Sequence, residues 1–99
     1  VHYHLVRIIR EAIGNAIKYA HATAVTIEAS SQPHGSEELV VTVTDDGQGF
    51  DVAERSAADG HFGIRGMHER ARRIGASLSI VSEPGQGTTV RISLPLASR

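Results

Sequence analysis

The chain has no cysteine and no tryptophan, and its 99 residues include only two phenylalanines and two tyrosines. Without cysteine, neither a disulfide framework nor a thiolate metal site can form. So few aromatic residues make a platform for stacking nucleic-acid bases a poor expectation. Ten lysines and arginines stand against eleven aspartates and glutamates, which gives no uniform basic field. We therefore expect no nucleic-acid partner.

Long hydrophobic runs are also missing. No segment approaches the roughly 20 apolar residues that cross a bilayer, and the first residues lack the layout of a secretion signal. Hydrophobic residues make up 40% of the chain and charged residues 21%. These values predict one soluble domain over residues 1–99, with a core of moderate size. We expect this domain to be cytoplasmic and to make no direct membrane contact.

Periodicity predicts the first half of the fold. Apolar residues recur every three or four positions from Leu5 to Ala20, which indicates one long amphipathic helix. Residues 24–30 and 39–44 alternate and are rich in β-branched side chains, so they predict two strands of an antiparallel hairpin. The polar segment 31–38 between them is expected to be a flexible tip.

The second half repeats this order. Residues 67–74 predict a short helix that stops at Gly75, and residues 78–81 and 89–94 predict a second hairpin. The sequence of helix, two strands, loop, helix and two strands indicates an α+β fold. We expect a two-layer α/β sandwich whose helices cover one face of a mixed, mostly antiparallel sheet.

An acidic pair followed by glycines stands at the end of the second predicted strand. Asp45 and Asp46 precede Gly47 and Gly49. An ionised carboxylate only accepts hydrogen bonds, so at the mouth of a pocket it selects a donor such as the amino group of adenine. The glycines would let a ligand approach the backbone. The same pattern also closes ordinary hairpins, and this segment alone leaves both interpretations open.

A polar stripe runs along the first predicted helix. Glu11, Asn15 and Lys18 follow one another at spacings of four and three residues, so they share a face that points away from the apolar one. Such a stripe suits a magnesium phosphate: the Asn15 carbonyl can join a Mg²⁺ shell, Lys18 can neutralise phosphate charge, and Glu11 can orient a water. Ordinary surface polarity is the alternative for each residue alone.

The loop over residues 47–66 contains five glycines and runs into the second predicted helix. Free backbone N–H groups and the helix dipole at that junction create an anion site, where phosphates would be held. A flexible link explains the glycines equally well. Four arginines between Arg65 and Arg73 lie beside the loop and favour a polyanion over a merely solvated face. His61 and His68 are given no catalytic role.

Taken in order, four segments resemble the N, G1 and G2 boxes and the terminal motif of the histidine kinase ATPase domain. They are Glu11-x-x-x-Asn15-x-x-Lys18, Asp45-x-Gly47-x-Gly49-Phe50, Gly60-x-x-Gly63-x-x-Gly66-Met67-x-Glu69-Arg70 and Gly85-x-Gly87-Thr88. The resemblance covers nearly the whole chain. It implies the Bergerat ATP-binding fold, an α/β sandwich that binds ATP under a glycine-rich lid. The stretch from Ile64 to Ala71 resembles sensor kinases that pair with helix-turn-helix response regulators.

This resemblance implies roles for single residues, with ATP and Mg²⁺ as cofactors. It assigns the adenine amino group to Asp45, the base pocket and lid hinge to Gly47 and Gly49, and Mg²⁺ to Asn15. Glu11 is the base in water-splitting relatives, but histidine kinases use an imidazole from another domain, so here it would at most act on Mg²⁺ through a water. The remaining expected ATP contacts are Lys18, Gly60, Gly63, Ile64, Gly66, Met67 and Thr88.

Two departures from the family pattern occur. Tyr19 stands where these kinases often have histidine, and His61 and Phe62 separate the first two glycines of the G2 box instead of one residue. The family also places the dimerising helical hairpin and the phosphoacceptor histidine in another domain, so we expect this chain to be a fragment.

The expected function is the ATP-binding catalytic domain of a bacterial two-component sensor histidine kinase. Its expected partners are the dimerisation and histidine phosphotransfer domain of the same kinase and a response regulator downstream. A serine kinase of the anti-sigma-factor type is one alternative, which the segment from Gly66 to Arg70 disfavours. A nucleotide-controlled binding module without chemistry is the other.

Overall fold

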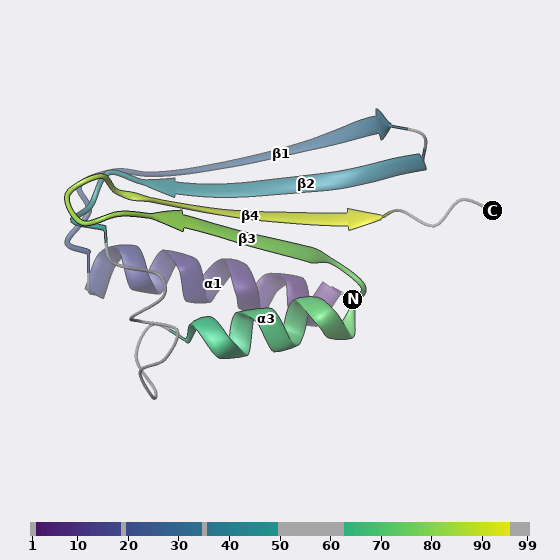
Figure 1. The fold of residues 1–99 in the computed structure, drawn as a ribbon, viewed down its shortest axis with the longest axis horizontal. Coiled ribbons are helices and arrows are strands. Elements are labelled where there is room, and N and C mark those ends of the chain that lie inside the picture. Colours follow the sequence, from purple (N-terminus) through teal and green to yellow (C-terminus); the bar gives the residue numbers. More distant parts are fainter. Residues whose placement is uncertain (1, 19, 35, 50–62, 96–99) are drawn as a thin grey trace.

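A computed structural model describes residues 2–18, 20–34, 36–49 and 63–95 of the chain. Two helices lie side by side under a four-stranded sheet (Figure 1). The helices are α1 (His2–Lys18) and α3 (Ile64–Arg73), and the strands are β1 (Val25–His34), β2 (Ser36–Asp45), β3 (Ser77–Ser82) and β4 (Thr88–Pro95). The predicted two-layer sandwich with helices on one face is confirmed. In the described part of the chain, neither helix is long and apolar enough to cross a membrane.

The strands follow the order β1-β2-β4-β3, and each neighbouring pair is antiparallel. The last strand therefore inserts between β2 and β3, and the described sheet has no parallel pair, although a mixed sheet was expected. One consequence bears on function: Asp45 at the end of β2 pairs with Thr88 at the start of β4, which pairs in turn with Ser82 at the end of β3. Three polar residues thus form one row at one end of the sheet.

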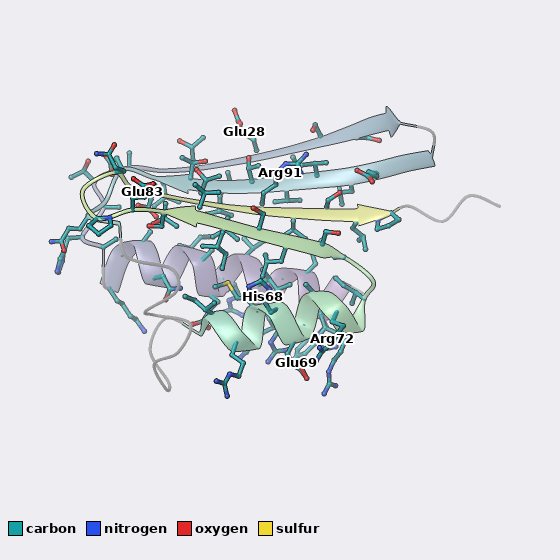
Figure 2. The ribbon with its side chains drawn as sticks, viewed as in Figure 1. Glu28, His68, Glu69, Arg72, Glu83 and Arg91 are labelled. Atoms are coloured by element: carbon teal, nitrogen blue, oxygen red, sulfur yellow. The ribbon has the colours of Figure 1, made fainter. Side chains whose placement is uncertain are left out.

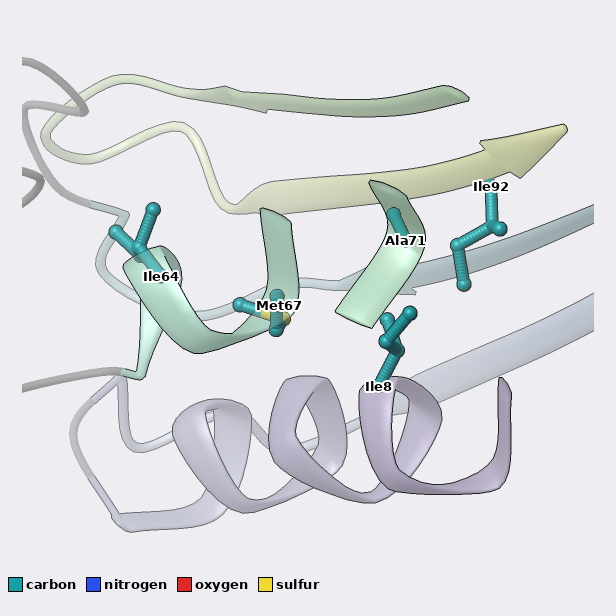
Figure 3. Close-up of a cluster of buried hydrophobic side chains, with 5 residues drawn as sticks. All are labelled: Ile8, Ile64, Met67, Ala71 and Ile92. Carbon is teal, nitrogen blue, oxygen red and sulfur yellow. The ribbon is translucent and has the colours of Figure 1, made fainter. Parts of the chain in front are cut away.

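The core lies between the helices and the sheet. Ile8 of α1 and Ile92 of β4 are fully buried, and they meet Ile64, Met67 and Ala71 of α3 (Figure 3). A second cluster joins three further residues, Ala12, Val43 and Val90. Burying such side chains is the main force that holds the layers together, because each removes a large apolar area from water.

The first hairpin differs from the prediction. Pairing between β1 and β2 continues to His34 and Ser36, so residues 31–38 are largely strand and the expected flexible tip is wrong. This segment is polar in sequence, which is why composition suggested a loop. Backbone hydrogen bonds across the pair extend the ladder without an apolar pattern.

The helix ends also shift by a few residues. α1 spans 2–18 instead of 5–20, and the buried Ala20 lies just past its end, where its N–H donates to the Asn15 carbonyl at 3.0 Å. α3 begins at Ile64, earlier than expected, because Ile64 already packs in the core. The predicted stop at Gly75 is confirmed: its φ is 71° and its N–H donates to the Arg72 carbonyl at 3.2 Å.

Candidate nucleotide-binding site

A narrow pocket of about 10 Å³, roughly the space of one water molecule, opens between the helix layer and the sheet, at the end where the polar row lies. Its walls come from α1, α3 and three strands, so residues distant in sequence meet in it. The lining residues are Ala12, Asn15, Ala20, Asp45, Met67, Ile80, Thr88 and Val90. Four of the predicted ATP contacts are among them: Asn15, Asp45, Met67 and Thr88. The lining is largely apolar with a few polar groups, a composition typical of small-molecule sites.

Asp45 is half-buried at the wall of this pocket. Its Oδ1 accepts a hydrogen bond of 2.7 Å from the N–H of Gly47. This contact fixes the carboxylate relative to the backbone of the following turn. A carboxylate held in this way presents acceptor atoms to the pocket and selects a ligand edge that carries a donor.

The two glycines after Asp45 are required by space. A Cβ at Gly47 would lie 2.5 Å from the Ala20 Cβ, so any side chain there would push against the pocket wall. Gly49 has a φ of 71°, and a Cβ there would collide with the Glu83 carbonyl at the turn between β3 and β4. The turn after β2 therefore packs closely on both neighbouring segments, and Figure 2 shows Glu83 at this end of the sheet.

Thr88 is the one buried polar residue among the described residues, with 8% of its surface exposed. Its Oγ1 lies 2.7 Å from the Ser82 Oγ, which in turn donates to the Gly87 carbonyl at 3.0 Å. A hydroxyl has one proton to donate. Either hydroxyl can be the donor in the contact between the two, and the Thr88 Oγ1 keeps a lone pair that can accept a hydrogen bond.

Asp46, the second acidic residue, has a different task. Its carboxylate accepts hydrogen bonds from the Thr23 N–H at 2.8 Å, the Thr23 hydroxyl at 2.5 Å and the Ala24 N–H at 3.0 Å. The hydroxyl of Thr23, helped by the backbone N–H groups, lowers the pKa of Asp46 below its ordinary value. Asp46 thus ties the segment after α1 to the end of β2, and it is Asp45 that lines the pocket.

A second, more open hollow of about 140 Å³ runs along the exposed side of α1. It is lined by Arg10, Glu11, Gly14, Asn15 and Lys18. The predicted polar stripe is therefore present as one surface. Asn15 is half-buried and lines both this hollow and the narrow pocket, so it marks the place where the two adjoin.

The glycine-rich segment approaches the same stripe at its described end. Gly63 immediately precedes α3, and a Cβ there would collide with the Glu11 carboxylate. This close approach joins the start of α3 to the helix that carries the stripe. Ile64 packs in the core, and Gly66 is exposed on α3. Gly60, also expected to contact ATP, lies outside the described residues.

The basic cluster of α3 lies away from the pocket. Arg72 pairs with Glu69, and Figure 2 shows both on the side of α3 turned away from the sheet. Arg70 stacks 5.7 Å from the Tyr3 ring centre and contacts the His4 Nδ1 at 3.3 Å. Partial burial and the neighbouring Arg70 lower the pKa of His4. The predicted polyanion contact of this cluster gains no support from these positions.

Sequence reasoning missed several residues of the pocket. Ser82 sets the Thr88 hydroxyl but has no part in the motif that identifies Thr88. The apolar walls Ala12, Ala20, Ile80 and Val90 were assigned to the core. One signal was available: positions 12, 16 and 20 are alanine, where 8, 9, 13 and 17 are isoleucine, and small side chains on one helix face leave room for a ligand.

Comparison with known proteins agrees with this geometry. Residues 1–98 match the family model described as histidine kinase-, DNA gyrase B- and HSP90-like ATPase. Sensor protein VraS of Staphylococcus haemolyticus (strain JCSC1435) is 39% identical over 93 residues, and VraS of Staphylococcus aureus (strain COL) is 38% identical. Each match covers 94% of this chain and 25% of the relative. The chain thus spans about a quarter of the length of these curated relatives.

Solved structures give the same result. The ATP-binding domain of PrrB from Mycobacterium tuberculosis superposes with a TM-score of 0.78 at 26% identity, over 97% of this chain and 69% of that one. The histidine kinase domain of a blue-light activated kinase from Erythrobacter litoralis gives 0.69 at 28% identity, over 94% and 43%. The family match and these relatives agree on one assignment: the chain belongs to the histidine kinase-, DNA gyrase B- and HSP90-like ATPases and is homologous to sensor histidine kinases.

Proposed function

We propose that this chain is the ATP-binding catalytic domain of a two-component sensor histidine kinase. It positions the γ-phosphate of Mg-ATP for attack by a histidine on a separate dimerisation domain, and the phosphoryl group then passes to a response regulator. The observation that carries the proposal is the junction at Asn15: a narrow, largely apolar pocket with a fixed carboxylate on one side, and a polar hollow with two cations on the other. The proposed compartment is the cytoplasm, where ATP is available.

The pocket supports recognition of adenine. Asp45 accepts from the exocyclic amino group, and the Thr88 hydroxyl, which also lines the pocket, offers an acceptor. Met67, Ile80 and the small alanines cover the faces of the base. A purine with a carbonyl oxygen in place of the amino group would set two acceptors against each other, so the site discriminates through an unpaired buried group.

The hollow on α1 supports the triphosphate and Mg²⁺. The carboxamide oxygen of Asn15 and the carboxylate of Glu11 are the oxygen donors that Mg²⁺ prefers, and Mg²⁺ typically takes only one or two protein ligands beside phosphates and waters. The described residues include no group of three acidic or histidine side chains that would hold the ion alone. When bound, Mg²⁺ neutralises charge that develops on the phosphates. Lys18 adds a cation on the same face.

Phosphoryl transfer needs mainly positioning and charge neutralisation, and both are within reach of these residues. The attacking imidazole comes from the partner domain. The domain by itself is therefore expected to bind ATP with little turnover. Glu11 has no proton to remove from an imidazole that is already a nucleophile, so its place in this proposal is beside Mg²⁺.

The decisive experiment uses the full-length kinase and the formation of acid-labile phosphohistidine from ATP. Asn15→Ala should abolish it, whereas Arg7→Gln, on the same helix but outside the hollow, should leave it intact. Phosphorylation that survives Asn15→Ala would overturn the proposal. An acid-stable phosphoserine on a partner protein would favour the anti-sigma-factor type. A partner affinity that responds to ATP without any phosphorylation would favour the binding module.

A further inference from the structure

Gly14 is an anomaly in the middle of α1. Glycine is the least favourable residue in a helix interior apart from proline, because it loses the most backbone freedom on folding. Nothing in the described structure requires it: a Cβ at Gly14 would meet no atom within 4 Å, and its φ is not in the left-handed region. Neither packing nor backbone conformation therefore explains this glycine.

The surroundings of Gly14 indicate what the open space is for. Arg10 precedes it by four residues and Lys18 follows it by four. An exposed cation therefore lies about one helical turn to each side of the glycine, on the same face of α1. Together with Glu11 and Asn15 they line the hollow of about 140 Å³. Two cations flanking a bare stretch of backbone suit an extended anion that lies along the helix.

The direction of approach follows from Asn15. This residue lines both the base pocket and the hollow, so a ligand whose base fills the pocket leaves it beside Asn15 and continues over the next turn of α1. We infer that the outer phosphates of ATP lie over Gly14, between Arg10 and Lys18, and that Gly14 is a clearance residue while Arg10 is a further phosphate contact. The inference rests on the proposed function and adds Arg10 and Gly14 to its site.

Two substitutions at Gly14 test this inference, because stability and binding should move in opposite directions. Alanine has higher helix propensity and meets no neighbour, so Gly14→Ala should raise Tm of the nucleotide-free chain by about 4–8 °C. The same change should weaken ATP binding about threefold. Gly14→Leu should weaken it by about tenfold or more, since a bulky side chain occupies the phosphate path.

Probes of different phosphate number locate the effect. Each Gly14 variant is titrated with ATP and with AMP by calorimetry, both with magnesium. The AMP affinity of each variant should stay within about twofold of that of the unchanged chain, because AMP lacks the outer phosphates. Arg10→Gln should weaken ATP binding about three- to tenfold and leave AMP unaffected. Arg7→Gln is the matched control, an exposed arginine on the same helix that does not line the hollow, and should change neither.

The outcomes separate cleanly. The inference is overturned if Gly14→Leu leaves the ATP affinity unchanged, or if it weakens ATP and AMP binding equally. In either case the proposed function still stands as long as the unchanged chain binds ATP. A fall in Tm of the nucleotide-free Gly14→Ala chain also overturns it, because another part of the protein would then occupy the space. Failure of the unchanged chain to bind ATP removes the proposed function itself.

Discussion

The two sides of the candidate nucleotide site are built in opposite ways. On the sheet side, Asp45, Thr88 and Ser82 stand in one row across three paired strands, and hydrogen bonds fix the carboxylate and both hydroxyls before any ligand arrives. On the helix side, Glu11 and Lys18 are exposed on α1 and do not belong to a paired strand. In the proposed function, this difference separates specificity from charge neutralisation: the hydrogen-bonded, half-buried side would select the base, and the exposed side would meet the phosphates.

The largest expected effect comes from breaking the rigid side. Asp45→Asn replaces half of the carboxylate by a donor that faces the amino group of adenine, so ATP affinity should fall about 100-fold. Calorimetric titration measures the change. Asp46→Asn is the matched control, since it alters an adjacent carboxylate that ties the loop and does not line the pocket. Equal losses in the two variants would contradict separate roles for these neighbours.

A smaller loss should follow from removing the residue that sets Thr88. Ser82→Ala deletes the hydroxyl that is hydrogen-bonded to the Thr88 hydroxyl. The Thr88 hydroxyl is then free to rotate. We expect ATP affinity to fall about three- to tenfold. If Ser82 has only a structural role, Ser82→Ala should lower Tm and weaken the binding of all nucleotides equally. Ser82→Thr, which restores the hydroxyl, should recover most of the affinity for ATP.

The exposed side should respond to salt, and the rigid side should not. Lys18→Gln should weaken ATP binding about threefold at low ionic strength, and raising the salt concentration should shrink this difference, because exposed charges are screened within about 10 Å. The loss in Asp45→Asn should stay constant over the same range. Titrations at two salt concentrations check both statements, and a Lys18 effect that grows with salt would break the comparison.

The smallest effect concerns stability and pH. Bonds from the Thr23 hydroxyl lower the pKa of Asp46 from its ordinary value of 3.8, so the folded state favours the ionised form. Such a group stabilises the fold above the ordinary pKa, and this contribution disappears as pH falls through the lowered one. Asp46→Asn should therefore lower Tm slightly at neutral pH, and the difference should vanish in acid. A difference that persists below the lowered pKa would show that charge is not the cause.

The sequence predicts the layers of this fold well because the signals are apolar and periodic. Ile8 and Ala12 mark the buried face of α1, and Val43 and Val90 mark that of the sheet. The extent of β1 and β2 beyond this core was not predictable, since the paired residues there lack an alternating apolar pattern in the sequence. Apolar periodicity in a sequence indicates which residues face the core, so strand pairing outside the core produces no such pattern.

The site was predictable where a motif names a single chemical group. Asp45 and Thr88 lie in the pocket as their motifs indicate, and Asn15 joins pocket and hollow. Ser82 was missed because its role depends on register: β3 and β4 pair so that Ser82 lies opposite Thr88. Similarly, the apolar pocket walls look like core in the sequence, because they carry the same kinds of side chain as the core.

The account depends most on the recognition of adenine by its amino group, and one titration tests this directly. The unchanged chain is titrated with ATP, GTP and inosine triphosphate, which differ at the position that Asp45 is proposed to contact. We expect ATP to bind about 100-fold more tightly than either of the other two, because both present a carbonyl oxygen to the carboxylate. Equal binding of all three nucleotides would contradict the account.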